Sequence, residues 1–260
     1  NGEWQNVDLD ANAMATVEIQ GSGQARLIIR NTGNTFLSDV ELLDILPHVG
    51  DKTVAPTGAG EGADRGSEWD ATLQSVTIRI YDAKGNEITS QYTLTGTLQY
   101  SANGNPTYTS PKTDLKTVGN GSHGFSTCVP AALAKSFFYR MNGNDRLAPG
   151  AYIVFEINLQ GPSTAGADQV DRWAYNSFAV AYLSRVGVNG AATKTAAPYE
   201  PAAQRFRLVD PSTATLSGNV FKDYNGNGVR DAGEPLFVAG VPMELYRLDA
   251  SGTQITEADG

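Results

Sequence analysis

The sequence has one cysteine, two histidines and no long apolar run, and each scarcity removes a class of protein. A single cysteine cannot build a disulfide framework or a thiolate zinc site. His48 and His123 are too few for a histidine-rich catalytic or transition-metal centre. No segment approaches the roughly 18 consecutive apolar residues that a membrane-spanning helix requires. We therefore expect no membrane span in this chain.

Basic residues are outnumbered by acidic ones. The 260 residues include 19 Lys and Arg against 28 Asp and Glu, which gives a formal net charge of −9. An isoelectric point near 4.7 argues against a nucleic-acid partner, because phosphate contacts need a basic face. The acidic excess is compatible with a hard cation held by oxygen ligands. With 28 Gly and 12 Pro, the composition is typical of a β protein with many turns.

Alternation of apolar and polar residues with a period of two recurs along the first 210 residues and predicts strands. The clearest example is 152–160, and similar runs lie at 16–20, 24–31, 36–46, 76–81, 92–100, 173–184 and 204–209. Clusters of Gly, Asn and Pro separate these runs, and only 130–135 suggests a turn or two of helix. Two long segments, 50–70 and 101–124, are expected to be loops. Many short strands separated by turns predict an all-β sandwich.

The strongest functional signal is the twelve-residue segment 223–234, DYNGNGVRDAGE. Calcium loops of twelve residues carry oxygen ligands at positions 1, 3, 5, 7, 9 and 12, with glycine at position 6 for a sharp turn. Gly228 occupies position 6, and the main-chain carbonyl would serve at position 7. The predicted Ca²⁺ ligands are Asp223, Asn225, Asn227, Val229, Asp231 and Glu234. A turn rich in Gly and Asn that binds nothing is the alternative.

The residues around this loop resemble a known family. Pro235 and an alternating run at 241–248 follow the loop, so it joins two predicted strands, 216–222 and 241–248, where an EF-hand would place a helix. The stretch Gly218–Leu245, GNVFKDYNGNGVRDAGEPLFVAGVPMEL, resembles the calcium-binding B-type repeat of serine-aspartate-repeat surface adhesins, a variant of the collagen-adhesin B-type sandwich. The resemblance implies that 217–260 are the first part of such a domain, after a linker at 211–216.

The preceding residues carry a second resemblance. The segments NTGNTFLSDVELLDILP (31–47), LAPGAYIVFEINL (147–159) and AYNSFAV (174–180) occur in the order of the immunoglobulin-like repeat of many bacterial surface proteins. Residues 46–54 and 65–73 are similar to the version in actinobacterial wall-anchored proteins. This resemblance implies an immunoglobulin-like β-sandwich over 1–210, a place in a surface stalk, and no enzyme activity.

Other candidate sites are weaker. Gly58–Ala63 fits a dinucleotide fingerprint formally, but it follows no convincing strand and opens no helix. Ser122 and His123 lack the elbow motif of serine hydrolases, and Cys128 is expected to be a small buried residue. Lys222 and Asn176 remain candidates for an isopeptide crosslink. A second calcium site could begin at Asp8-x-Asp10-x-Asn12.

Together these features predict a structural and adhesive stalk module of an exported bacterial protein, anchored to the cell wall in its full-length form. Calcium would stiffen the second domain and its junction with the first, and neighbouring tandem domains of the same chain would be partners. One alternative is a carbohydrate- or host-protein-binding module that uses Trp4, Trp69 or Trp173. Another is a non-catalytic domain of a secreted enzyme. Both ends are expected to continue into a longer protein.

Overall fold

The computed structural model describes residues 16–57, 61–106, 124–163, 170–210, 221–227 and 229–236. The chain divides into two units, Asn1–Ser212 and Thr213–Gly260. The predicted linker, 211–216, lies outside the described residues, as do the predicted second strand of the calcium-binding domain and the Asp8–Asn12 motif. The description of the second unit is therefore that of its loop region, 221–236 without 228.

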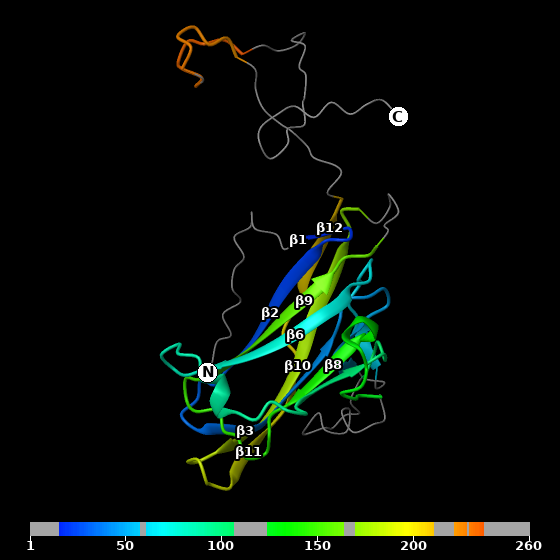
Figure 1. Cartoon of the computed structure of the whole chain (residues 1–260), viewed down its shortest axis with the longest axis vertical. Coiled ribbons are helices and arrows are strands. Elements are labelled where there is room, and N and C mark those ends of the chain that lie inside the picture. Colours follow the sequence, from blue (N-terminus) through cyan, green and yellow to red (C-terminus); the bar gives the residue numbers. More distant parts are fainter. Residues whose placement is uncertain are drawn as a thin grey trace. The chain divides into compact units, whose positions relative to one another are not determined.

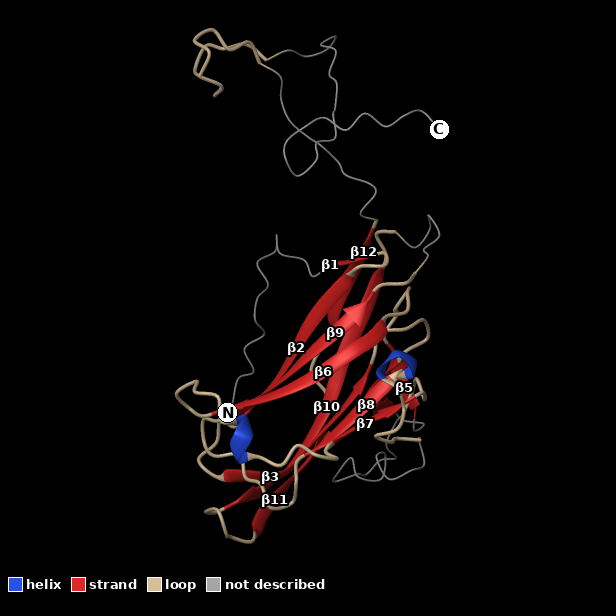
Figure 2. Ribbon diagram, in the orientation of Figure 1, coloured by secondary structure: helices blue, strands red, loops and turns tan. Residues whose placement is uncertain are grey.

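The first unit is built from three β-sheets (Figure 2). The largest has seven strands in the order β1-β12-β10-β3-β8-β7, with β11 also paired to β10; the others are β2-β9-β6 and the hairpin β4-β5. The pair β1–β12 is parallel, and the other strand pairs in the described residues are antiparallel. The strands are β1 Thr16–Glu18, β2 Ser22–Arg30, β3 Phe36–Ile45, β4 Lys52–Thr57, β5 Glu61–Asp64, β6 Thr72–Tyr81, β7 Leu98–Ser101, β8 Ser136–Arg140, β9 Tyr152–Gln160, β10 Trp173–Arg185, β11 Ala192–Tyr199 and β12 Gln204–Val209. Single 3₁₀ turns occur at η1, Thr89–Gln91, and η2, Ala131–Leu133.

The all-β prediction is confirmed, and the two larger sheets form a sandwich. Figure 1 shows β9 and β6 passing in front of β10. The inward side chains of β9, from Ile153 to Leu159, are buried in one core with residues of β3, β8, β10 and β12. Tyr139 of β8 and Phe155 of β9 meet edge to face, with ring centres 5.0 Å apart. The alternation in the sequence therefore places one face of each strand in this core.

The central strand β3 is buried on both faces. Its inner face contributes Val40 and Leu42 to the core between the sheets. Its outer face lies in a second, smaller core that also contains residues of β4, β8 and β10 and one residue before η2: Leu43, Ile45, Val54, Phe125, Phe138, Ala179 and Ala181. The seven-stranded sheet is thus covered on its outer side as well as on its inner side at this point.

The sequence predicted a loop at 50–70. This prediction is wrong, because the segment contains the hairpin β4–β5. The glycines of this segment obscure the strand pattern, yet Gly62 is required for the hairpin. A side chain on Gly62 would place Cβ 1.7 Å from the carbonyl oxygen of Thr53, so only glycine fits. The residues of the formal dinucleotide fingerprint that are described, 61–63, lie in β5 and do not open a helix. Strands β8 and β11 were also not predicted, and the run 92–100 forms a strand only at Leu98–Ser101.

Two turn motifs that are far apart in sequence meet at the buried side chain of Asn31. Its Nδ2 donates to the carbonyl oxygens of Thr35, at 2.8 Å, and Leu147, at 3.0 Å. Its Oδ1 accepts from the main-chain N–H of Gly33 at 3.1 Å. Gly150, whose φ of +80° favours glycine, donates its main-chain N–H to the carbonyl of Asn31. One amide therefore joins the turn before β3 to the turn before β9.

Asn31→Ala is expected to lower the free energy of unfolding by about 1–3 kcal/mol, because buried carbonyls lose their donors. Urea denaturation followed by tryptophan fluorescence measures this change. The control is Asn34→Ala at an exposed position of the same turn, which should change the value by no more than about 0.5 kcal/mol. Equal effects of the two substitutions would contradict the assigned role of Asn31.

Candidate functional site

The loop of the second unit curls through a series of side-chain-to-backbone hydrogen bonds. Asp223 Oδ1 accepts from the N–H groups of Asn225, at 3.2 Å, and Gly226, at 2.6 Å. Asn225 Oδ1 accepts from the N–H of Asn227 at 3.1 Å, and Asn227 Oδ1 accepts from that of Val229 at 2.8 Å. Residues at loop positions 1, 3 and 5 thus each form a turn over the next two residues. This spacing brings alternate side chains to the same side of the loop.

The acidic residues at positions 9 and 12 close the loop. Asp231 Oδ2 accepts from Nδ2 of Asn225 at 2.7 Å and from Nδ2 of Asn227 at 2.9 Å. Glu234, which is 5% exposed, accepts from the N–H of Tyr224 through Oε1 and from the N–H of Asp231 through Oε2, each at 2.9 Å. The N–H of Lys222 donates to the carbonyl of Pro235 at the base of the loop. Positions 3, 5 and 9 are therefore in contact, and Glu234 ties the two ends together.

The donor chemistry of this loop fits a hard cation. Its side-chain donors are carboxylates and amides, whose oxygens suit Ca²⁺, and Val229 would contribute its carbonyl while its side chain is 62% exposed. Asn225 and Asn227 direct nitrogen toward Asp231, so a cation there would require both amides to present oxygen instead. In the described part of the chain, no three His, Cys, Asp or Glu side chains cluster as a metal site. The position-6 glycine, Gly228, lies outside the described residues.

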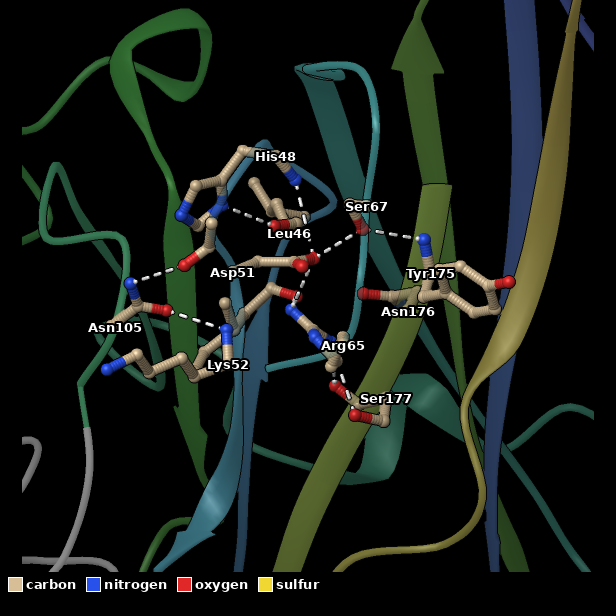
Figure 3. A network of polar contacts seen from close by, with 12 residues as sticks. Leu46, His48, Asp51, Lys52, Arg65, Ser67, Asn105, Tyr175, Asn176 and Ser177 are labelled. Carbon is tan, nitrogen blue, oxygen red and sulfur yellow. Dashed lines mark hydrogen bonds and ion pairs between the residues drawn. The ribbon is translucent and has the colours of Figure 1, made fainter. Parts of the chain in front are cut away.

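A buried polar network lies in the first unit beside the hairpin β4–β5 (Figure 3). The side chain of Arg65, 1% exposed, pairs with Asp51 at 3.2 Å between Nη2 and Oδ2. It also donates to the carbonyl oxygen of Ile45 at the end of β3 and to the carbonyl and hydroxyl oxygens of Ser177 on β10. Ser67 donates its hydroxyl to Asp51 at 2.7 Å. The network therefore joins the hairpin to the two central strands of the large sheet.

Burial governs the electrostatics of this network. It raises the pKa of Asp51, while the charge of Arg65 and the hydrogen bond from Ser67 act in the opposite direction. It lowers the pKa of Arg65, which Asp51 and other nearby carboxylates partly restore. Arginine stays protonated in proteins, so the pair is a buried ion pair. Sequence analysis missed this pair because Arg65 and Asp51 lie in a segment expected to be a loop.

Asn176, a candidate for an isopeptide crosslink, has a carboxyl partner. Its Nδ2 donates to Oδ2 of Asp44 at 3.0 Å, and both side chains are buried. The positive charge of Arg65 acts on Asp44 and lowers the pKa of its carboxyl group, against the larger effect of burial. Lys222, the other crosslink candidate, places Nζ 4.9 Å from the ring centre of Tyr224.

Cys128 is exposed, which contradicts the expectation of a buried residue. It lies in a turn before η2, where its N–H donates to the hydroxyl oxygen of Ser126. Ser122 and His123 are outside the described residues.

Of the tryptophans proposed for ligand binding, the two that the structure describes are not fully exposed to solvent. Trp69 is fully buried in the main core. Trp173 is half-buried, and the guanidinium of Arg205 lies 4.2 Å from the centre of its ring. Trp4 lies outside the described residues. The alternative of carbohydrate or host-protein binding therefore gains no support from Trp69 or Trp173.

Comparison with known proteins gives distant structural similarity only. No protein-family model matches the sequence, and no curated protein sequence matches it either. The collagen-binding subdomain of the Enterococcus faecalis surface protein ACE is similar with a TM-score of 0.35 and 10% identity, over 74% of this chain and 92% of that one. A second ACE structure, an MSCRAMM described as binding its ligands by the collagen hug model, has the same score and identity over 75% of this chain and 49% of that one.

A structure designated BspA_C_WT has a TM-score of 0.34 and 8% identity, over 76% of this chain and 45% of that one. This chain thus spans about half the length of this structure and of the second ACE structure. Scores this low carry no functional inference, so the all-β assignment depends on the sheets themselves. Within the described residues, no helix has the length and apolar character needed to cross a membrane.

Proposed function

We propose that this chain is a non-enzymatic structural and adhesive module of an exported bacterial surface protein, and that its second unit binds calcium through the loop 223–234. The arrangement of this loop is the observation that carries the proposal. Its side-chain hydrogen bonds curl the backbone so that Asn225, Asn227 and Asp231 meet, and Glu234 closes it. The β-sandwich of the first unit and the resemblance of 218–245 to adhesin repeats are consistent with a stalk or adhesin region.

Charge neutralisation is the chemistry that calcium would supply. Asp223, Asp231 and Glu234 bring three carboxylates into twelve residues. Like charges at such spacing repel one another, and a divalent cation offsets that repulsion while it binds loop oxygens. Extracellular calcium modules bind with Kd values of about 10⁻⁴–10⁻³ M. At tenfold excess over Kd, binding would stabilise the loaded unit by about 1.4 kcal/mol.

Calcium titration of the full chain by isothermal calorimetry tests the site. The wild-type chain is expected to bind Ca²⁺ with a Kd in that millimolar to sub-millimolar range, and Asp223→Ala and Glu234→Ala should each weaken binding by about tenfold or more. Val229→Ala is the matched control. Because position 7 would use only the main-chain carbonyl and the Val229 side chain is exposed, this substitution should leave the affinity unchanged.

Hydrogen exchange of the second unit, with calcium and with a chelator, tests the structural consequence. We expect slower amide exchange in the calcium-bound chain and no such change in Glu234→Ala. Unchanged affinity in both alanine variants would rule out the loop as the calcium site. Amide exchange that is identical with ion and with chelator would rule out a stiffening role for calcium.

A further inference from the structure

The acid–amide pair formed by Asp44 and Asn176 is buried on the face of the seven-stranded sheet that packs against the opposite sheet. Asp44 of β3 is opposite Phe178 of β10, so Asn176, two residues earlier on β10, is its diagonal neighbour on the same face. That face carries Leu42 and Val180 into the core between the sheets. Both polar side chains lie away from solvent, with Asp44 0% and Asn176 5% exposed.

The hydrogen bonds of this pair are incomplete if Asp44 is ionised. Asn176 Nδ2 donates to Asp44 Oδ2, but Asp44 Oδ1 and Asn176 Oδ1 are both buried without a partner among the described residues. Two oxygen atoms without protons cannot bond to each other. A proton on Asp44 Oδ1 could donate to Asn176 Oδ1 and satisfy both atoms at once. We propose that Asp44 is a neutral carboxylic acid that forms a reciprocal, two-hydrogen-bond pair with Asn176, which makes the stability of the first unit sensitive to pH.

The charges around the pair favour the same state. Arg65 and Glu200 are the charged groups whose fields act on Asp44. Arg65 is already paired with Asp51, and Glu200 accepts hydrogen bonds from Ser177 and from the main chain of Ala55. If Asp44, Asp51 and Glu200 were all ionised, three negative charges would face one arginine. Burial, the largest influence, raises the pKa of Asp44 to about 7, against the smaller lowering effects of Arg65 and Asn176.

The sign of the pH effect follows from this shift. In the unfolded chain Asp44 loses its proton near pH 4, whereas in the folded chain it keeps the proton to about pH 7. Between these values the unfolded state binds fewer protons, so stability falls as the pH rises. The stabilisation from the neutral Asp44 is complete below pH 4. Between pH 4 and pH 7 the folding equilibrium constant falls by up to about tenfold per pH unit. Above about pH 7 this stabilisation is lost.

Asp44→Asn tests the proposal, because a second amide preserves the shape and can form the same reciprocal pair without a proton. Denaturant unfolding of wild-type and variant chains should be measured from pH 4 to pH 8. We expect similar stabilities at pH 4 and a more stable variant at pH 8. The control is Asp82→Asn: Asp82 is partly exposed, and hydrogen bonds from Asn86 lower its pKa, so this substitution should not stabilise the chain at pH 8.

Carbon-13 NMR titration of the wild-type Asp44 carboxyl, assigned by its absence from Asp44→Asn, gives a second measurement that does not depend on variant stability. A midpoint well above pH 5 supports the neutral acid. A midpoint near pH 4, or an Asp44→Asn variant that is less stable than wild type at pH 8, would overturn the proposal.

Discussion

Arg65→Met is expected to lower the free energy of unfolding by about 3–5 kcal/mol, because it leaves the buried carboxylate of Asp51 without its counter-ion. Methionine keeps much of the side-chain length, so the loss would come from charge and hydrogen bonding more than from a cavity. The carbonyl oxygens of Ile45 and Ser177 would lose their guanidinium donors as well. Guanidinium chloride denaturation of the full chain measures the change.

The pH dependence distinguishes this mechanism from a packing defect. Burial raises the pKa of Asp51, and Arg65 counteracts that rise, so the variant should hold Asp51 protonated to a higher pH. The destabilisation should therefore be larger at pH 8 than at pH 5. Arg79→Met is the matched control, because Arg79 is 42% exposed in its ion pairs with Glu87 and Glu156. Surface pairs contribute about 0–1 kcal/mol, and an equal loss in the two variants would refute the assignment.

Phe155→Ala is expected to cost about 3–5 kcal/mol, the usual range for removing a fully buried aromatic ring. Phe155 lies on the middle strand of the three-stranded sheet, flanked in register by Leu27 and Ile78. Its ring meets that of Tyr139 from the opposite sheet. Loss of the ring would leave a cavity between the two layers, which neighbouring strands cannot close without moving the sheets.

Ile28→Ala is the control for Phe155→Ala. Ile28 is on the outer face of β2, 39% exposed, and its neighbour Leu27 is opposite Phe155. Because it does not contribute to the core between the sheets, we expect a loss well below that of Phe155→Ala. Thermal unfolding monitored by circular dichroism compares the two, and similar shifts in Tm would show that the central ring has no special place in the core.

Several of the predicted strands have one buried face and one more polar face, although β3, which is buried on both faces, was also predicted. In the segment 152–160 the inward residues are buried, whereas four of the five outward residues, all but Val154, remain partly exposed, so most of the segment alternates. Strand β8, Ser136–Arg140, has buried residues on both faces and no alternation, so its pattern could not be recognised. The hairpin β4–β5 escaped prediction for a different reason, since Gly62 is needed there for close backbone approach.

The candidate sites also differ in how far they could be predicted from the sequence. All the proposed ligands of the calcium loop fall within twelve consecutive residues, so their spacing can be recognised in the sequence. The pair Asp44–Asn176 joins residues 132 positions apart, and the contact of Arg65 with Ser177 joins residues 112 apart. Nothing in the local pattern of β3 indicates that an aspartate would lie in the core.

The sequence by itself determined the all-β class, most strand positions and the oxygen-rich loop, because these features depend on side-chain alternation and on short spacing. Only the tertiary structure decided which polar residues are buried. The outer face of β3 is covered by β4 and by residues of neighbouring strands, and its inner face by the opposite sheet. Burial in a sheet depends on what packs against each face, and those contacts come from segments far away in the chain.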